Sequence, residues 1–269
     1  MSKTTSQDSG FPGWYITLQT AVLNQLPRPG ELDQVTAEGW QKNQKALKEA
    51  LETALLKRLE SPATVIKPSD SQIKAAEIMG KNVFGIAEAM KYYKVKPTKK
   101  ELKELEVVPF SEEKLRAYAA THILVADFGL SVMDVWEQHG ELFYCRMDPW
   151  YGNRCEAKWA RKRVKAQWRL LRKTAVPDSF NKYLSEQEAL LTKEEEVPEA
   201  REMVYMVIEH YLATDEMLFW SGYVRTKNLS GDGRRIRIGR FDSSGLGIDF
   251  WYGDANYYVG LASSVRASC

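Results

Sequence analysis

The sequence predicts an α+β protein, with a mostly helical N-terminal region at residues 1–120 and a second domain at residues 121–269 that combines an antiparallel sheet with flanking helices. Two observations lead to this prediction. Apolar residues recur at helical spacing in the first region, whereas apolar and polar residues alternate from Tyr223 onward. In addition, helical and strand-like segments form separate runs, which favours an antiparallel sheet over a doubly wound one.

The N-terminal region contains several segments with helical periodicity or helix-start residues. The clearest helix is expected at residues 36–59, where apolar side chains fall on one face and Lys and Glu on the other, and a shorter one is expected at 14–26. Ser71–Tyr93 has the pattern of a helix pair. Thr98 and Ser111 are residue types that commonly cap a helix N-terminus. We therefore expect this region to be built from helices.

The second region mixes helices and strands before its C-terminal segment begins. Strands are expected at residues 123–125 and 168–172, and helices at 156–163, 186–192 and 198–214.

The C-terminal segment has the period-two alternation of half-buried strands. Strands are expected at residues 235–238, 246–251 and 259–265, with turn-forming sequences such as Ser230–Gly233 and Asp242–Gly245 between them. The sequence therefore predicts that the domain ends in an antiparallel meander.

The bulk composition excludes some classes of protein. A net charge of +2 argues against nucleic acid as a partner recruited by overall charge. No apolar run reaches the length that spans a membrane, and the first ten residues lack the order of a signal peptide. We expect a protein that is soluble as synthesised and does not insert into a membrane.

The three cysteines do not define a metal site. Cys145, Cys155 and Cys269 have neither a CxxC spacing nor a zinc pattern with histidine. Free thiols are the favoured interpretation, and a disulfide between Cys145 and Cys155 stays an alternative. We expect no bound metal and no cofactor.

No catalytic motif is apparent in the sequence. His122, His139 and His210 are scattered and have no nucleophile at a recognised spacing. A hydrolase or transferase built from His139, Cys145 and Asp148 is an alternative that has suitable residue types but no spacing signature. We expect that the protein is not an enzyme.

The strongest local concentration of positive charge lies at residues 158–173. This segment interleaves arginines and lysines with Trp159 and Trp168, a combination that can bind single-stranded nucleic acid through phosphate contacts and base stacking. A solvent-exposed face with core tryptophans explains the segment better, because its flanks are rich in Glu. Nucleic-acid binding is therefore an alternative and not the leading hypothesis.

The composition of residues 228–268 differs from that of the rest of the chain. This segment contains no Lys, Glu, Gln or Met and instead uses Ser, Asn, Asp, Tyr, Gly, Ala and Arg. Strands and turns are poor in Lys and Glu in any case, which accounts for part of the difference. The same residue types are typical of antibody-like binding surfaces. Randomising the two adenines of an Asn codon that ends in a pyrimidine also never yields Lys, Glu, Gln, Met or Trp, and Trp251 is the exception here.

Three stretches of the chain carry a resemblance to a known family: Trp168–Thr174, Tyr223–Thr226 and Val259–Arg266. With the helical segments between them, they resemble the variable proteins of diversity-generating retroelements, and more narrowly the divergent group from Nanoarchaeota-like archaea and their viruses. The likeness covers roughly residues 120–269. It implies a C-type-lectin-like fold, and a ligand-binding surface whose codons an error-prone reverse transcriptase mutagenises at adenines.

The resemblance implies particular roles for residues of the diversified segment, about 228–268. The chain lacks the calcium motifs of sugar-binding C-type lectins and the cysteine pair of formylglycine-generating enzymes, so neither carbohydrate binding nor that enzymatic activity is implied. The expected partner is a macromolecule, most simply a protein, and display on a cell or virion would need another route. The expected ligand-binding positions are Arg235, Arg237, Arg240, Ser243, Ser244, Gly247, Asp249, Tyr252, Asp254, Ala255, Asn256, Tyr257 and Tyr258. The expected scaffold positions are Ile236, Ile238, Phe241, Leu246, Ile248, Phe250, Val259 and Leu261.

Overall fold

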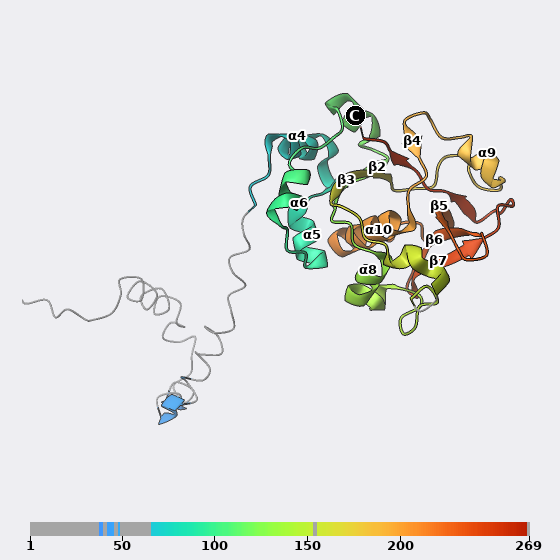
Figure 1. Ribbon diagram of the computed structural model, residues 1–269. Helices are drawn as coiled ribbons and strands as arrows, with labels where there is room; N and C mark the ends of the chain where they lie inside the picture. Colours follow the sequence, from blue (N-terminus) through green and yellow to red (C-terminus); the bar gives the residue numbers. More distant parts are fainter. Residues whose placement is uncertain (1–37, 40–41, 46–47, 49–65, 153–154, 268–269) are drawn as a thin grey trace, which may run out of the picture. The chain divides into compact units, whose positions relative to one another are not determined.

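The computed structural model describes residues 38–39, 42–45, 48, 66–152 and 155–267 (Figure 1). The chain divides into two compact units, Met1–Val65 and Ile66–Cys269. The helix expected at residues 14–26, and most of the one expected at 36–59, lie outside the described residues. The fold described below is that of the second unit.

The second unit is an α+β structure, as the sequence predicts, with its C-terminal part mostly in strands. None of its helices is long and apolar enough, in the part of the chain that is described, to cross a bilayer. The helices are α4 (Asp70–Met79), α5 (Ile86–Tyr93), α6 (Lys99–Glu104), α7 (Glu112–Tyr118), α8 (Val132–His139), α9 (Leu184–Glu188) and α10 (Ala200–Thr214). The strands are β1 (Val83–Phe84), β2 (His122–Asp127), β3 (Gln167–Arg172), β4 (Glu195–Glu196), β5 (Tyr223–Leu229), β6 (Arg235–Asp242), β7 (Gly245–Trp251), β8 (Val259–Leu261) and β9 (Ser264–Val265).

The strands form two mixed sheets. The first has the order β1-β2-β3-β9-β4, and the second has the order β7-β6-β5-β8. β5, β6 and β7 form the expected antiparallel meander. However, β8 pairs with β5 in parallel, and β1 pairs with β2 in parallel. The prediction of an antiparallel sheet is therefore correct for the meander and wrong for the sheets as a whole.

The last strand segment, expected to be continuous over residues 259–265, is divided between the two sheets. Leu261 still pairs with Arg225 in the second sheet, and the Ala262 N–H donates to the Arg225 carbonyl at 3.1 Å. One residue later the Ser263 carbonyl accepts from the Arg172 N–H at 3.0 Å, which belongs to the first sheet. The end of the chain therefore links both sheets through its main chain.

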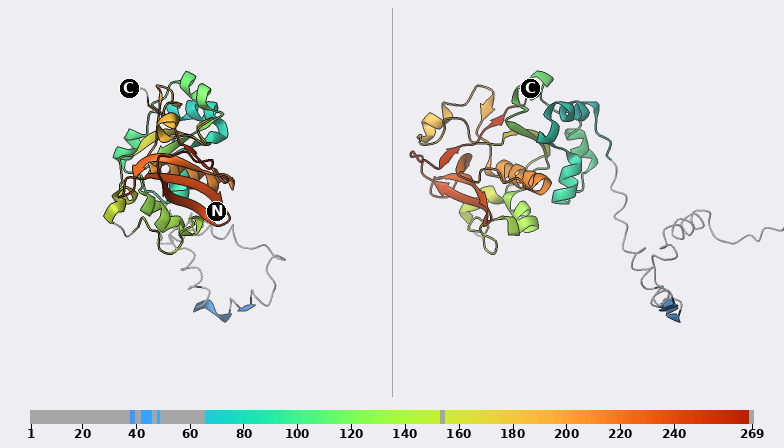
Figure 2. Two further views of the ribbon diagram at one scale, coloured as in Figure 1. Left: turned by 90° about the vertical axis from the view of Figure 1, so that its right-hand side faces the viewer. Right: turned by 180° about the vertical axis from the view of Figure 1, so that it is seen from behind.

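Helix α10 lies at the centre of this unit (Figure 1). Its residues 200–210 are all buried, and it packs against strands of both sheets as well as α5 and α8. The N-terminal helices α4–α6 and the strands β5–β7 lie at opposite ends of the unit in both face-on views (Figures 1 and 2). The meander therefore has one face on the α10 core.

Local signals predict the N-terminal helices well. Thr98 and Ser111 cap α6 and α7, because their hydroxyl oxygens each accept a hydrogen bond from the N–H three residues later, at 3.2 Å. The expected pair at residues 71–93 corresponds to α4 and α5, with β1 between them. These helices share a hydrophobic core with Leu124 of β2 and Leu170 of β3, so the packing is continuous across residue 120, where the sequence predicts a boundary.

Three elements differ from expectation. The sequence does not predict α8, which begins after Ser131, whose hydroxyl caps the Asp134 N–H. A 3₁₀ helix at Cys155–Arg161 replaces the α-helix expected at 156–163. Helix α9 covers Leu184–Glu188 instead of 186–192. Short helices are marginal without tertiary contacts, so their bounds depend on packing that local sequence does not encode.

Candidate binding surface

The two faces of the β5–β6–β7 meander have different chemistry. The inner face packs on the α10 core and carries six of the expected scaffold positions. Five of these are at most 7% exposed, namely Ile236, Ile238, Phe241, Leu246 and Ile248, whereas Phe250 is half-buried beside Trp150. The other two, Val259 and Leu261, are 0% exposed but lie on β8, where they pair with Tyr223 and Arg225.

The outer face of the meander holds an arginine between two aromatic rings. The Arg237 guanidinium lies 4.2 Å from the centroid of the Tyr223 ring and 4.7 Å from that of Trp251. It also pairs with Asp249 on β7, the residue opposite it in the ladder, at 2.6 Å. Cation–π contacts of this kind are worth about 0.5–2 kcal/mol each. Two of the expected binding positions, Arg237 and Asp249, are therefore joined to each other and to a fixed aromatic pair.

Gly247 is an exception among the expected binding positions, because the structure buries it. A Cβ atom at this residue would lie 2.9 Å from the Tyr223 hydroxyl and 2.9 Å from the Gly239 carbonyl oxygen. The Tyr223 ring thus occupies the space that a side chain would need. The expectation that Gly247 presents a variable side chain is corrected here, and the position serves instead as a platform for Tyr223.

The other two arginines lie at opposite ends of β6. Arg235 is half-buried and hydrogen-bonds the Lys227 carbonyl and Glu188 of α9. Arg240 is exposed and sits at an irregularity of the β6–β7 pairing, with a φ of 44°, and its N–H donates to the Gly222 carbonyl at 2.8 Å. Only Arg240 therefore extends a charge freely away from the sheet. Irregularities of this kind, such as β-bulges, re-aim side chains.

The turn between β6 and β7 carries Ser243 and Ser244, and both are exposed. The Ser244 N–H donates to the Asp242 carboxylate at 2.8 Å, which fixes the turn. This turn and residue 252 lie at opposite ends of β7, about 26 Å apart at the usual rise of a strand. The expected binding positions therefore extend along the whole length of the meander.

The loop that joins β7 to β8, residues 252–258, is called the crossing loop below. Tyr252, Tyr257 and Tyr258 are 63%, 74% and 68% exposed, and Asp254 is exposed as well. Ala255 and Asn256 are half-buried, and the Asn256 side-chain oxygen accepts from the Tyr258 N–H at 2.8 Å. The loop thus presents three phenol rings and a carboxylate to solvent.

The crossing loop lies on the same side of the sheet as Arg237. Arg225 pairs with Arg237 in the β5–β6 ladder, so the two side chains point to the same face. The Arg225 guanidinium donates to the carbonyls of Tyr252 and Asp254. The structure therefore brings the crossing loop and the Arg237–Asp249 pair together on one surface of the meander. We call this surface the outer face. The strands of the meander face the viewer in the left-hand view of Figure 2.

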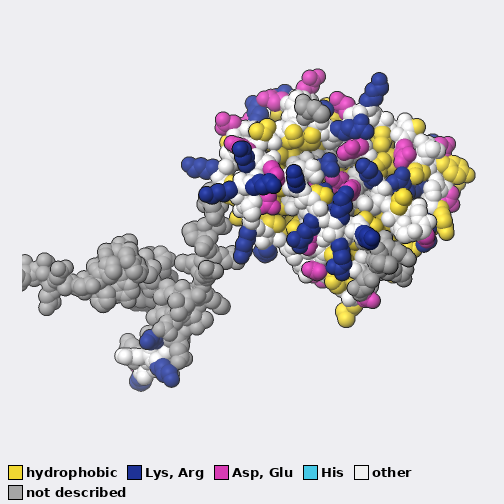
Figure 3. Space-filling model, viewed as in Figure 1, with side chains coloured by type: hydrophobic (Ala, Val, Ile, Leu, Met, Phe, Trp, Pro, Cys, Tyr) yellow, Lys and Arg dark blue, Asp and Glu magenta, His cyan; other side chains and the backbone are white. Residues whose placement is uncertain are grey.

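Other residues of the outer face were not predicted. Tyr223 and Arg225 lie before residue 228 and carry no compositional signal. Phe180 and Tyr183, 43% and 58% exposed, belong to the segment that touches the crossing loop. Hydrophobic side chains are visible at the right-hand edge of Figure 3, where Figure 1 draws α9 and this loop. The one sequence signal for Arg225 is a charged residue at an interior strand position, between Val224 and Thr226.

The basic segment at residues 158–173 is occupied by contacts within the protein. Trp168 is buried and donates its indole N–H to the Leu105 carbonyl at 2.9 Å. Lys162 pairs with Glu199 at 2.7 Å, Arg163 with Asp134, and Arg169 with Glu202 and Glu196. These pairs account for much of the charge pattern, and nucleic-acid binding stays an untested alternative.

Two residues of the enzymatic alternative, His139 and Cys145, make ordinary structural contacts. His139 Nε2 lies 2.9 Å from the Tyr92 carbonyl, and the Cys145 carbonyl accepts from the Trp136 indole. Cys145 is a free, half-buried thiol. Over the described ranges, no group of three His, Cys, Asp or Glu side chains could hold a metal ion.

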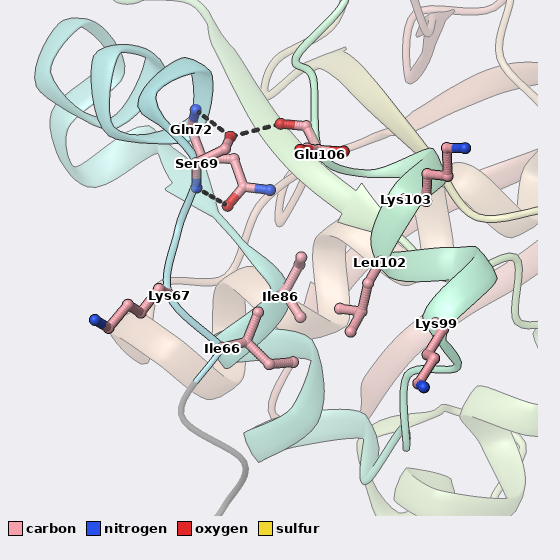
Figure 4. Close-up of a pocket in the computed structure, with 9 residues that line it drawn as sticks. All are labelled: Ile66, Lys67, Ser69, Gln72, Ile86, Lys99, Leu102, Lys103 and Glu106. Atoms are coloured by element: carbon pink, nitrogen blue, oxygen red, sulfur yellow. Dashed lines mark hydrogen bonds between the residues drawn. The ribbon is translucent and has the colours of Figure 1, made fainter.

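A pocket of about 400 Å³ lies among α4, α5 and α6, away from the outer face (Figure 4). Ile66, Ile86 and Leu102 form its apolar wall. Lys67, Lys99 and Lys103 also line it, but their ammonium groups point in different directions, away from one another (Figure 4). The three ammonium groups therefore do not converge on one point, as the polar groups that orient a small ligand do, and Ser69, Gln72 and Glu106 of the lining bond one another.

No protein-family model matches the chain, and no curated protein or solved structure is detectably similar to it.

Proposed function

We propose that the protein is a non-enzymatic, receptor-like binding protein, and that its outer face recognises macromolecular partners. The observation that carries this proposal is the separation of two sets of side chains within one short segment. Between residues 235 and 261, aliphatic side chains fill the core, while Tyr, Asp, Ser and Arg side chains reach solvent from the same strands and loops.

The composition of the outer face supports a protein as the partner. Tyr and Arg are enriched at the centres of protein interfaces, and Tyr supplies contact area at a low cost in conformational entropy. The crossing loop exposes three tyrosines, and Tyr223, Arg237 and Trp251 lie beside it as a rigid base. Such a surface offers rigid aromatic contacts together with adaptable polar ones.

We further propose that the segment at about 228–268 is diversified by a retroelement and that the second domain has a C-type-lectin-like fold. Three features support this proposal: the resemblance, the absence of Lys, Glu, Gln and Met from the segment, and the exposure of most of its expected variable positions. Diversification requires surface positions where substitution costs little, and exposed sites usually change stability by less than about 0.5 kcal/mol.

The DNA around the gene tests the diversification. We expect a near-copy of the codons for residues 228–268 that differs mainly at adenines, beside a gene for a reverse transcriptase. The differences should fall on codons of exposed residues such as Tyr257 and Asp254, and spare those of Ile238 and Leu246. A complete flanking sequence with no such copy would reject diversification of this gene by its own element.

A further inference from the structure

The crossing loop is attached to the rest of the domain mainly through its own main chain. The Gly253 carbonyl accepts from the Leu184 N–H at 2.8 Å, and the Asn256 carbonyl accepts from the Asn181 N–H at 2.9 Å. Neither bond involves a side chain of the loop. Both anchors lie in residues 179–188, outside the segment proposed to be diversified.

Arg225 adds a second set of main-chain attachments. Its side chain is 0% exposed, and its two terminal nitrogens donate to four oxygens. Two are the carbonyls of Tyr252 and Asp254 in the crossing loop, at 3.1 Å for Tyr252. The others are the Lys182 carbonyl at 3.3 Å and the Gln187 side-chain oxygen at 2.6 Å. Arg225 thus ties the crossing loop and the 179–188 segment to β5.

Gln187 completes the attachment at the far end of the loop. It is fully buried, and its side-chain nitrogen donates to the carbonyls of Ser179 at 2.6 Å and Val259 at 2.9 Å. The Ser179 hydroxyl in turn accepts from the Leu261 N–H at 3.0 Å. The start of β8 is therefore fixed by the same group of side chains that fixes the start of the loop.

The partners of Arg225 show why this position needs a guanidinium. All four acceptors are neutral oxygens, and among the described residues no carboxylate lies within ion-pair distance of its side chain. A buried charge that makes no ion pair is costly: burial lowers the pKa of Arg225, and the more distant Asp254 carboxylate opposes this without reversing it. Only the planar fork of an arginine reaches several separated acceptors at once. Packing alone would be served by an apolar residue.

We infer that Arg225, together with Gln187, is a positioning residue that holds the crossing loop by its main chain, so that the loop keeps one shape whatever side chains it carries. The inference rests on the proposed function, because it explains how a surface can vary without losing its geometry. Neither residue is proposed to contact the ligand.

Amide hydrogen exchange on the full chain tests this inference without a ligand. The N–H groups of Asn181 and Leu184 donate to loop carbonyls, so their exchange rates report whether the loop is docked. In Arg225→Lys, which keeps the charge but loses the fork, we expect both amides to exchange about tenfold to a hundredfold faster, which corresponds to the loss of a charge-assisted hydrogen bond. Gln187→Met should have an effect in the same direction.

Two comparisons separate this inference from the proposed function. Arg235→Lys is the matched control, because Arg235 also bonds a carbonyl, that of Lys227, and does not bond the crossing loop. Lysine keeps the charge that pairs with Glu188 of α9, so both amides should be unchanged. A variant with Tyr252, Asp254, Tyr257 and Tyr258 all replaced by Ser should also keep both rates within about twofold, since exposed substitutions cost little.

The outcomes are distinct. Unchanged rates in Arg225→Lys and Gln187→Met would overturn the positioning role and leave the proposed function intact. Faster exchange in the four-serine variant would instead count against a freely variable surface. An equal rise at buried α10 amides in both Arg225→Lys and Gln187→Met would show a global structural role, and would also overturn the inference.

Discussion

Replacing Arg201 with methionine is expected to lower the free energy of unfolding by about 3–5 kcal/mol, the usual cost of removing one partner from a buried ion pair. Arg201 is 2% exposed and pairs with Asp127 at 2.7 Å and with Glu202 at 3.2 Å, which are themselves 1% and 2% exposed. Methionine fills similar space but carries no charge. The two carboxylates would then remain in the core without that partner.

Urea denaturation at neutral pH measures this loss. Arg163→Met is the matched control, because Arg163 pairs with Asp134 but its side chain is 68% exposed. Exposed pairs contribute about 0–1 kcal/mol, so the control should be nearly as stable as the parent protein. Equal stability of the two variants would show that the network around Arg201 does not hold β2 and α10 together.

Replacing Glu209 with glutamine is expected to remove a strong pH dependence of stability. Glu209 lies on α10 and is 0% exposed, and neither of its carboxylate oxygens meets a hydrogen-bond donor of the described chain. Burial raises the pKa of its carboxyl well above the usual value, and the nearby Glu88 and Asp127 carboxylates raise it further. The carboxyl is therefore protonated in the folded protein at a pH where the unfolded chain has released the proton.

The sign of the effect follows from this difference. The folded state holds the proton more tightly, so the contribution of Glu209 to stability is fully present below the unfolded pKa of 4.5 and is lost as the pH rises toward the folded pKa. The slope contributed by one such group is at most about 1.4 kcal/mol per pH unit. Glu209→Gln should flatten the profile and stabilise the protein most at the alkaline end.

Urea midpoints between pH 5 and 8 test this expectation. Glu77→Gln provides the control, because the Glu77 side chain is 61% exposed and pairs only at the surface with Lys74. Parallel profiles for Glu209→Gln and the parent protein would contradict a buried neutral carboxyl at this position.

The features predicted correctly from the sequence are those set by neighbouring residues. Thr98 and Ser111 cap helices because each hydroxyl accepts a hydrogen bond from the N–H three residues later. This contact is local and needs no tertiary partner. Likewise, Ile236 and Ile238 are buried because period-two alternation assigns one face of a strand to the core. These signals fix the helices α6 and α7 and the meander itself.

The features missed depend on contacts between distant segments. Strands β8 and β9 are separate because the main chain bonds Arg225 of the second sheet at Ala262 and Arg172 of the first sheet at Ser263. No local sequence pattern encodes this change of partner. The alternation along β7 predicts that Gly247 points outward. In the structure the Tyr223 ring fills the space that a side chain at this position would need. The role of Arg225 is visible only once the crossing loop covers it.

The candidate surface is similarly divided between predictable and unpredictable parts. The composition of residues 228–268 points to Tyr252, Tyr257 and Tyr258, and all three are exposed. Composition gives no indication of Phe180 and Tyr183, which are exposed in the segment that bonds the crossing loop. The composition predicts that the three tyrosines are exposed, whereas the structure shows what surrounds them.

The free energy of unfolding of two pairs of variants tests the central claim most directly. Tyr257→Ser and Tyr258→Ser change exposed tips of the crossing loop, whereas Ile238→Ala and Leu246→Ala truncate side chains that are 0% and 1% exposed on the inner face of the meander. We predict losses below about 1 kcal/mol for the first pair and about 2–5 kcal/mol for the second. Equal losses in the two pairs would contradict a variable surface on a fixed scaffold.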